Sequence, residues 1–202
     1  MNAFKLALIA SAALCALQAQ ALTTTVTYGS TSVEPGATAI DFDSAPPAGW
    51  SYSGGALFTS SIGGVAAQPP GSSGNFWSIG ASGGQDGPGM VALACGASYY
   101  GFLWGSPDTY NTVSFYDGAT LLGSFTGAAV WSPADGDQSI GRYFNAYAGS
   151  GEKITSIMFT STGNAFETDN HAVVAVPEPG TYALMLAGLA AVGFVARRRR
   201  AV

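Results

Sequence analysis

The side chain best suited to acid–base chemistry is His171, the only histidine in the 202-residue chain. A Ser-His-Asp site would need this ring beside an activated nucleophile. The sequence predicts no nucleophile elbow of the kind found in many hydrolases, in which a strand, a sharp turn and a helix follow one another. His171 also lies close to the end of the predicted domain. We therefore expect His171 to be non-catalytic and the protein not to be an enzyme.

Carboxylates offer a second kind of chemistry, because they occur in closely spaced pairs. Asp41 and Asp43, like Asp135 and Asp137, are two residues apart and would share one face of a strand. Paired carboxylates can hydrolyse glycosides. A glycosidase usually has a larger scaffold with a cleft, however, and nothing in the sequence signals one.

A third arrangement of carboxylates predicts a metal site. Asp41 and Asp43 follow an early predicted strand, whereas Glu167 and Asp169 precede the last one. The first and last strands of a β-sandwich are often neighbours, so the four side chains would converge on one Ca²⁺, an ion that prefers oxygen ligands. The alternative is that they are solvated surface carboxylates. Zinc is not expected, because the sequence has no cluster of His and Cys.

Aromatic residues make up 12% of the chain, and exposed aromatic rings can stack on sugars. Trp77 and Trp104 are the candidates for such glycan platforms. Because the domain is short of Leu and Ile, most of its aromatic residues must fill the core. At most one or two are therefore expected to be exposed.

Short β-like runs separated by turn residues dominate residues 22–175, and no helical apolar stripe precedes the tail. Asp117-Gly118 is typical of a tight hairpin turn. The pattern predicts an all-β ectodomain, a jelly-roll-like β-sandwich. Strands are expected at Thr23–Tyr28, Ala39–Phe42, Gly55–Phe58, Phe76–Ile79, Met90–Leu93, Tyr99–Trp104, Thr112–Tyr116, Thr120–Phe125, Arg142–Tyr147, Ile154–Thr160 and Ala172–Val176.

The first 21 residues have the composition of a secretory signal peptide. Lys5 precedes an apolar run, which ends in Ala19-Gln20-Ala21, an A-x-A cleavage site. We expect this segment to be a helical signal peptide that is removed after Ala21. The remaining domain keeps one cysteine, Cys95, so it has no internal disulfide. Its apolar neighbours predict a small buried side chain rather than a reactive thiol.

Between the signal peptide and the tail, the charge balance is strongly acidic. Arg142 and Lys153 stand against eleven Asp and Glu residues, a net charge of about −9. Such a surface repels nucleic acid and anionic lipid, so no nucleic-acid partner is expected. It is compatible with divalent cations and with neutral glycans.

The tail, residues 176–202, contains three parts. Pro177-Glu178-Pro179 comes first, an uncharged apolar stretch follows, and Arg197-Arg198-Arg199-Arg200 closes the tail. The middle part predicts a single transmembrane helix over residues 181–196. It is short for a bilayer core of about 30 Å, and the arginines would hold it with their charges on the cytoplasmic side. A basic tail that binds nucleic acid is disfavoured, because the rest of the chain is acidic.

These parts, in this order, resemble the PEP-CTERM sorting signal of Gram-negative bacteria. The resemblance covers residues 176–201. It implies recognition by an exosortase, a membrane-embedded cysteine transpeptidase-like enzyme, and removal of the tail after a transient stay in the inner membrane. Hosts of this system typically make exopolysaccharide, so delivery to the cell surface or extracellular matrix is implied. The alternative is a permanent single-span anchor.

Two functions remain open on this basis. The first is a non-enzymatic surface or matrix protein that is processed by an exosortase and associated with exopolysaccharide or biofilm matrix. The second is a carbohydrate-binding module of lectin type with a structural Ca²⁺. The sequence does not identify a ligand for either.

Overall fold

The computed structural model describes residues 21–177, 180, 184–190, 192 and 197. Apart from Ala21, the predicted signal peptide lies outside the described residues. So do Glu178 and Pro179 of the predicted sorting motif and Arg198–Arg200 of the arginine cluster.

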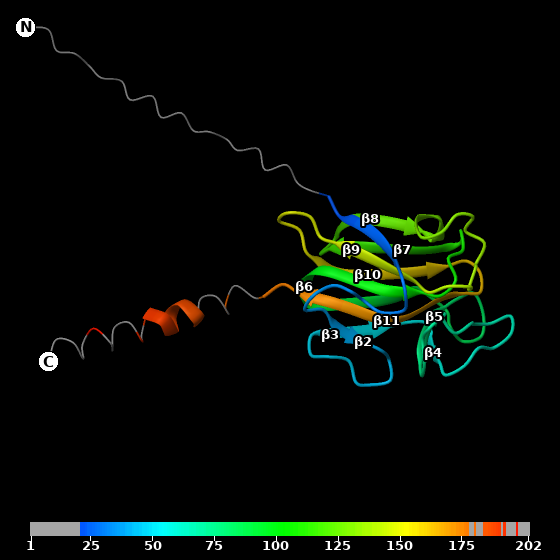
Figure 1. Cartoon of the computed structure of the whole chain (residues 1–202), viewed down its shortest axis with the longest axis horizontal. Coiled ribbons are helices and arrows are strands. Elements are labelled where there is room, and N and C mark those ends of the chain that lie inside the picture. Colours follow the sequence, from blue (N-terminus) through cyan, green and yellow to red (C-terminus); the bar gives the residue numbers. More distant parts are fainter. Residues whose placement is uncertain (1–20, 178–179, 181–183, 191, 193–196, 198–202) are drawn as a thin grey trace, which may run out of the picture.

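Residues 21–177 form eleven strands and one short 3₁₀ helix, so the prediction of an all-β ectodomain is confirmed (Figure 1). Recurrent Gly and Pro between short apolar runs account for this, since they end strands and permit tight turns. In chain order the elements are β1 (Thr23–Tyr28), β2 (Thr38–Ile40), β3 (Trp50–Ser53), β4 (Ala56–Phe58), β5 (Phe76–Ile79), β6 (Gly89–Trp104), β7 (Asn111–Asp117), β8 (Thr120–Thr126), η1 (Gly127–Ala129), β9 (Arg142–Tyr147), β10 (Ile154–Ser161) and β11 (Phe166–Ala175).

The described strands join one antiparallel hydrogen-bonded network that divides along β6 (Figure 1). Residues 89–93 of β6 pair with β3 and β10, and β10 continues to β7 and β8. Ala97 still pairs with Ile154 of β10, and from Ala97 onward β6 also pairs with β11 and β9. In this second half β9 also pairs with β1, and β11 pairs with β2 and β5. The long strand β6 therefore belongs to both halves.

The two halves contact each other through aromatic rings. The ring centroids of Phe102 in β6 and Phe159 in β10 are 5.1 Å apart. Phe115 of β7 stacks on Phe144 of β9 with a centroid distance of 6.1 Å. All four side chains are fully buried. The sequence is short of aliphatic residues, so burial of aromatic surface provides much of the hydrophobic stabilisation.

Irregular pairing in β6 changes which residues face this core. The odd-numbered Leu93 faces this core before Gly96, whereas the even-numbered Phe102 and Trp104 face it toward the end of β6. Gly96 has a φ of +71°, and a Cβ at this position would approach Lys153 Cδ to 2.8 Å. Glycine suits such a bulge because it lacks both the steric restriction on φ and the Cβ.

A second irregularity occurs in β11, between Asp169 and Ala172. Asn170 has a φ of +48°, a conformation that Asn tolerates better than most residues. Phe166 belongs to the main aromatic core before the bulge, and Val173 belongs to it afterwards. The bulge therefore moves the core-facing positions from even to odd numbers, which brings His171 inside.

Two strands, β6 and β11, are longer than the sequence pattern predicted. Met90–Leu93 and Tyr99–Trp104, predicted as two strands, are parts of the single strand β6. The last strand begins at Phe166 rather than Ala172. Gly118, with a φ of +56°, lies in the turn between β7 and β8, as predicted.

The tail is described only in part. Residues 184–190 are helical, and large apolar side chains such as Leu184 and Leu189 are exposed. Nowhere in the described part of the chain is a helix both long and apolar enough to cross a membrane. The predicted transmembrane helix is therefore not supported by these residues, and residues 181–183, 191 and 193–196 of it lie outside them.

Candidate functional site

A polar cleft of about 340 Å³ lies where four segments meet. Residues 61–67 and 106–110 form two parts of its wall, and residues 135–138 and 164–167 form the others. The last of these segments is the loop that enters β11 together with its first two residues, and the second is the turn after β6. Loops and strand ends that converge on a concave surface are the usual location of binding sites.

Glu167 links two walls of this cleft. Its side chain is nearly fully buried, and its Oε1 accepts a hydrogen bond from the Ala67 N–H at 2.8 Å. Its Oε2 accepts one from the Ser106 hydroxyl at 2.5 Å. Burial raises the pKa of this carboxyl, while the Ser106 hydroxyl lowers it. These two hydrogen bonds tie residues 67 and 106 together, so Glu167 fixes the shape of the cleft.

Asp108 and Asp135 are the carboxylates that remain available in the cleft. Burial raises the pKa of Asp108, and the neighbouring charge of Asp135 raises it further. The Tyr110 hydroxyl donates a hydrogen bond to Asn164 O at 3.0 Å. Burial, followed by interactions with Asp108, raises the pKa of Tyr110, so it stays a neutral phenol at physiological pH.

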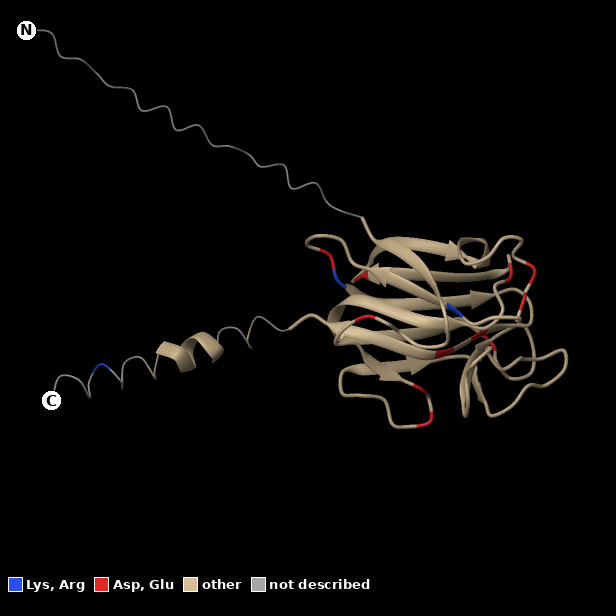
Figure 2. Cartoon of the chain, in the orientation of Figure 1, with Lys and Arg blue, Asp and Glu red and all other residues tan. Residues whose placement is uncertain are grey.

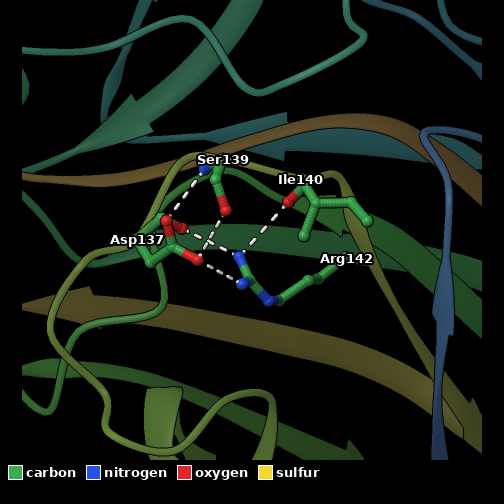
Figure 3. Close-up of polar contacts among 4 residues, drawn as sticks. All are labelled: Asp137, Ser139, Ile140 and Arg142. Atoms are coloured by element: carbon green, nitrogen blue, oxygen red, sulfur yellow. Dashed lines mark hydrogen bonds and ion pairs between the residues drawn. The ribbon is translucent and has the colours of Figure 1, made fainter.

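A buried arginine holds the loop that supplies Asp135 and residues 136–138 to the cleft. Figure 3 shows the Arg142 guanidinium pointing into this loop, where Nη1 donates to the carbonyl oxygens of Asp137 at 2.8 Å and Ile140 at 3.2 Å. Nη2 contacts the Asp137 carboxylate at 2.5 Å. The guanidinium also lies 3.9 Å from the centroid of the Trp131 ring. The ion pair, the two bonds to main-chain carbonyl oxygens and the ring contact together fix the loop beside the start of β9.

The chemistry of this cleft suits ligands that donate hydrogen bonds. Its lining residues include Ser, Asp, Glu, Gln, Asn and Tyr but no Lys, Arg or His. Figure 2 shows that acidic residues are spread over the domain, with few basic ones among them. Such a surface disfavours anionic ligands. From the sequence, Asp135 was predicted only as half of a carboxylate pair. Asp108 was not predicted as a site residue, although its place in the turn after an aromatic strand was an available signal.

His171 lies outside this cleft and is enclosed by the aromatic core. The side chain is fully buried, and Phe42, Trp50 and Tyr100 are among the rings that surround it. Its Nδ1 shares a hydrogen bond of 2.5 Å with the Tyr100 hydroxyl. Its Nε2 shares one of 2.9 Å with the Thr168 hydroxyl. Burial lowers the pKa of His171 to about 3, so the imidazole is neutral over the physiological range.

The four predicted calcium ligands do not form one site. Glu167 turns toward the cleft, as described above. Asp169, fully buried in β11, is instead close enough to Asp43 and Asp41 for their charges to raise its pKa. Burial is the larger cause, and the pKa of Asp169 rises to about 7. Within the described chain, no three Asp, Glu, His or Cys side chains form a group that could hold a metal ion.

The prediction that Trp77 and Trp104 are glycan platforms is wrong. Both rings are fully buried. Trp77 donates from Nε1 to Gly54 O at 2.9 Å, and Trp104 stacks on Phe166 with a centroid distance of 4.4 Å. In a domain with few aliphatic side chains these large rings are needed to fill the interior, and no face remains for a sugar.

The folded domain ends where the tail begins. β11 ends at Ala175, and the Val176 N–H still donates to Gly96 O at 3.0 Å. Residues 175–200 match the family model of the PEP-CTERM protein-sorting motif. The chain carries a PEP-CTERM sorting motif. No match is found among curated proteins or among solved structures.

The PEP-CTERM motif marks an exported protein that an exosortase recognises, with a membrane-anchored sorting precursor. Its first matched residue is the last residue of β11, so the motif overlaps the fold by a single residue. Pro177, which follows directly, cannot donate to a further sheet hydrogen bond. The PEP-CTERM segment is therefore separate from the sheet that it follows.

Proposed function

We propose that the protein is a non-enzymatic surface or extracellular-matrix protein that an exosortase releases by cutting near Pro177-Glu178-Pro179. The observation that carries this proposal is the position of the sorting motif directly after the last strand. A cut beyond Val176 removes no strand of the described domain. The released domain would keep all its sheet pairing and associate with exopolysaccharide or biofilm matrix.

The apolar part of the tail supports a transient stay in the inner membrane. More than half of the surface is exposed in each of four large apolar side chains, Leu184, Met185, Leu186 and Leu189. Exposed apolar groups of this size are favoured in a lipid environment. In this proposal residues 181–196 span the membrane and Arg197–Arg200 remain on the cytoplasmic side.

Mass spectrometry of the mature protein tests this proposal. Surface material from wild-type cells is expected to contain a chain that lacks Arg197–Arg200. Cells without the exosortase are expected to keep the full tail and to retain the protein in the membrane. A variant with Arg197–Arg200 replaced by Ala serves as a retention control, since the short span would lose its charged stop. If both strains yield the same uncut chain, the tail is a permanent anchor and the proposal fails.

A second candidate function is the binding of a neutral polyhydroxylated ligand, such as a matrix saccharide, in the polar cleft. The specific observation is the pair of carboxylates Asp108 and Asp135 in a concave site of about 340 Å³ without basic residues. Carboxylates accept hydrogen bonds from sugar hydroxyls. This function fits the jelly-roll-like β-sandwich that we propose for the domain, and it does not use the buried tryptophans.

A glycan array probed with the purified protein tests the second candidate. Saturable binding to neutral glycans is expected, and Asp108→Asn is expected to weaken it by about tenfold, the effect of one lost charge-assisted hydrogen bond. Asp86→Asn, which changes an exposed carboxylate outside the cleft, is the matched control. Binding that both variants retain equally would exclude the cleft as the site.

A further inference from the structure

Strand β1 forms a free edge of the sheet network. Within the described chain it pairs with β9 alone, so the main-chain groups along its other side meet no strand. Its six residues include no charge, proline or glycine, and Thr, Val and Tyr all favour extended structure. Natural proteins usually protect an exposed edge with charged side chains, proline or a bulge, because an unprotected edge is a template for another strand. β1 has none of these protections.

The other edge strands of the described network are shorter or irregular. β2, β3 and β4, which also pair with a single strand each, have only three or four residues. β8 has seven residues, but its pairing with β7 shifts register between Phe115 and Tyr116, and such a bulge disfavours a new partner. β1, in contrast, pairs with β9 over six consecutive residues without a shift. It is therefore the edge best suited to continue as a sheet.

The aromatic core is incompletely covered beside this edge. Leu22 and Val26 pack against the core from the β1 side and Leu122 from β8, yet all three are only partly buried. β1 and β8 run along the same side of the domain (Figure 1), where a Cβ at Gly123 would approach Leu22 Cδ2 to 3.1 Å. Neither strand carries a charge. An uncharged, partly apolar seam thus follows the free edge, and covering it would be favourable.

The charge of the domain indicates which molecule can occupy this side. Acidic residues far outnumber basic ones, so two copies of the chain repel each other in most orientations. Along β1 and β8 they can meet without like charges in contact. A basic partner would be drawn to the acidic loops instead. An identical strand also supplies a complementary row of N–H and C=O groups when a two-fold axis perpendicular to the sheet relates the copies.

We propose that β1 pairs antiparallel with β1 of a second copy, which joins two domains into one continuous sheet. The two-fold axis places residues of like parity opposite each other, so Val26 of both copies faces the seam while Thr25 lies on the solvent face. One strand pair is a small interface. The association is therefore expected to be reversible and to require a high local concentration. The proposal goes beyond exosortase processing and does not use the polar cleft.

Light scattering of the purified exported protein, over about 10–500 µM, tests the pairing. The average mass is expected to rise with concentration toward twice the monomer mass. Thr25→Glu is expected to raise the midpoint concentration by about tenfold or more, because it brings like charges together across the pair. Added salt should strengthen the association of the wild type, since it screens the repulsion between acidic domains.

Thr59→Glu is the matched control for the added charge. Thr59 is exposed and follows β4, on the side of the domain opposite β1 in Figure 1, so this variant should associate as the wild type does. The melting temperature of Thr25→Glu, expected within about 2 °C of wild type, shows whether the variant is folded.

Hydrogen exchange supplies a readout that needs no variant. Amides of Thr23–Tyr28 that point away from β9 should exchange more slowly at high than at low protein concentration, whereas those of β4 should not change. A mass that stays that of the monomer at every concentration overturns the proposal. So does an association that Thr25→Glu retains, or one that leaves exchange in β1 unchanged, because the interface then lies elsewhere.

Discussion

Replacement of Asp169 by asparagine is expected to stabilise the protein by about 2–4 kcal/mol at pH 8. The reason is the pKa of Asp169, which burial raises from 3.8 to about 7. At pH 8 the folded protein must hold this buried carboxylate in its charged form, and a rise in pKa of this size corresponds to several kcal/mol. Asparagine removes the charge and keeps the size of the side chain.

The pH dependence distinguishes this explanation from a general packing effect. A carboxyl whose pKa is raised in the folded state favours folding below its unfolded pKa, and this contribution is lost as the pH rises through the folded value. The stability difference between Asp169→Asn and wild type should therefore be small at pH 4 and largest at pH 8. Urea denaturation at five pH values measures it, with Asp86→Asn as control. A difference that does not change with pH would contradict the raised pKa.

The second large effect is expected at His171 and has the opposite sign. Burial lowers the pKa of His171 to about 3, below its ordinary value of 6.5. The buried neutral imidazole makes its full contribution to the free energy of unfolding above pH 6.5. This contribution is lost as the pH falls toward 3, because the unfolded chain takes up a proton that the folded protein does not. Between pH 6.5 and pH 4 the loss amounts to about 3 kcal/mol. The variant His171→Gln keeps a polar side chain for Tyr100 and Thr168 and has no group that titrates in this range. The difference in the free energy of unfolding by which wild type exceeds this variant should therefore shrink as the pH falls.

Two measurements are needed, because Asp169 and His171 act in opposite directions over the same pH range. A wild-type stability curve alone would show them partly cancelled, whereas the difference between wild type and His171→Gln isolates the histidine. The chain has one histidine, so its imidazole NMR signals are unambiguous. They should not move between pH 8 and pH 5. A titration midpoint near 6.5 would show that the ring is not enclosed as described.

The sequence pattern was sufficient for short strands that are set off by turn residues. β1 and β5 have the predicted bounds, and the Asp117-Gly118 turn lies between β7 and β8. It was insufficient where a bulge changes the alternation. In β6 the change at Gly96 made one strand resemble two, since the period of two residues is interrupted.

The candidate sites depended on β11, which the sequence pattern described least well. Glu167 and Asp169 were expected in a loop because charged residues are rare in buried strands. The structure places them in the strand, where the Asn170 bulge separates them from the core face occupied by His171. The neighbourhood of Asp41 and β11 was predicted from the order of strands, and β2 does pair with β11. The cleft could not be predicted, because it is formed by four segments far apart in the sequence.

The place of β11 in the sheet also bears on how the protein is made. This strand pairs with β2, β5 and β6, yet it is the last one to be synthesised. Until residue 175 has left the ribosome, these three strands lack the partner that joins them, and much of the aromatic core stays open. A nascent chain therefore has no complete domain to unfold when its first residues reach the export machinery. Folding is deferred until the sorting segment itself has been made.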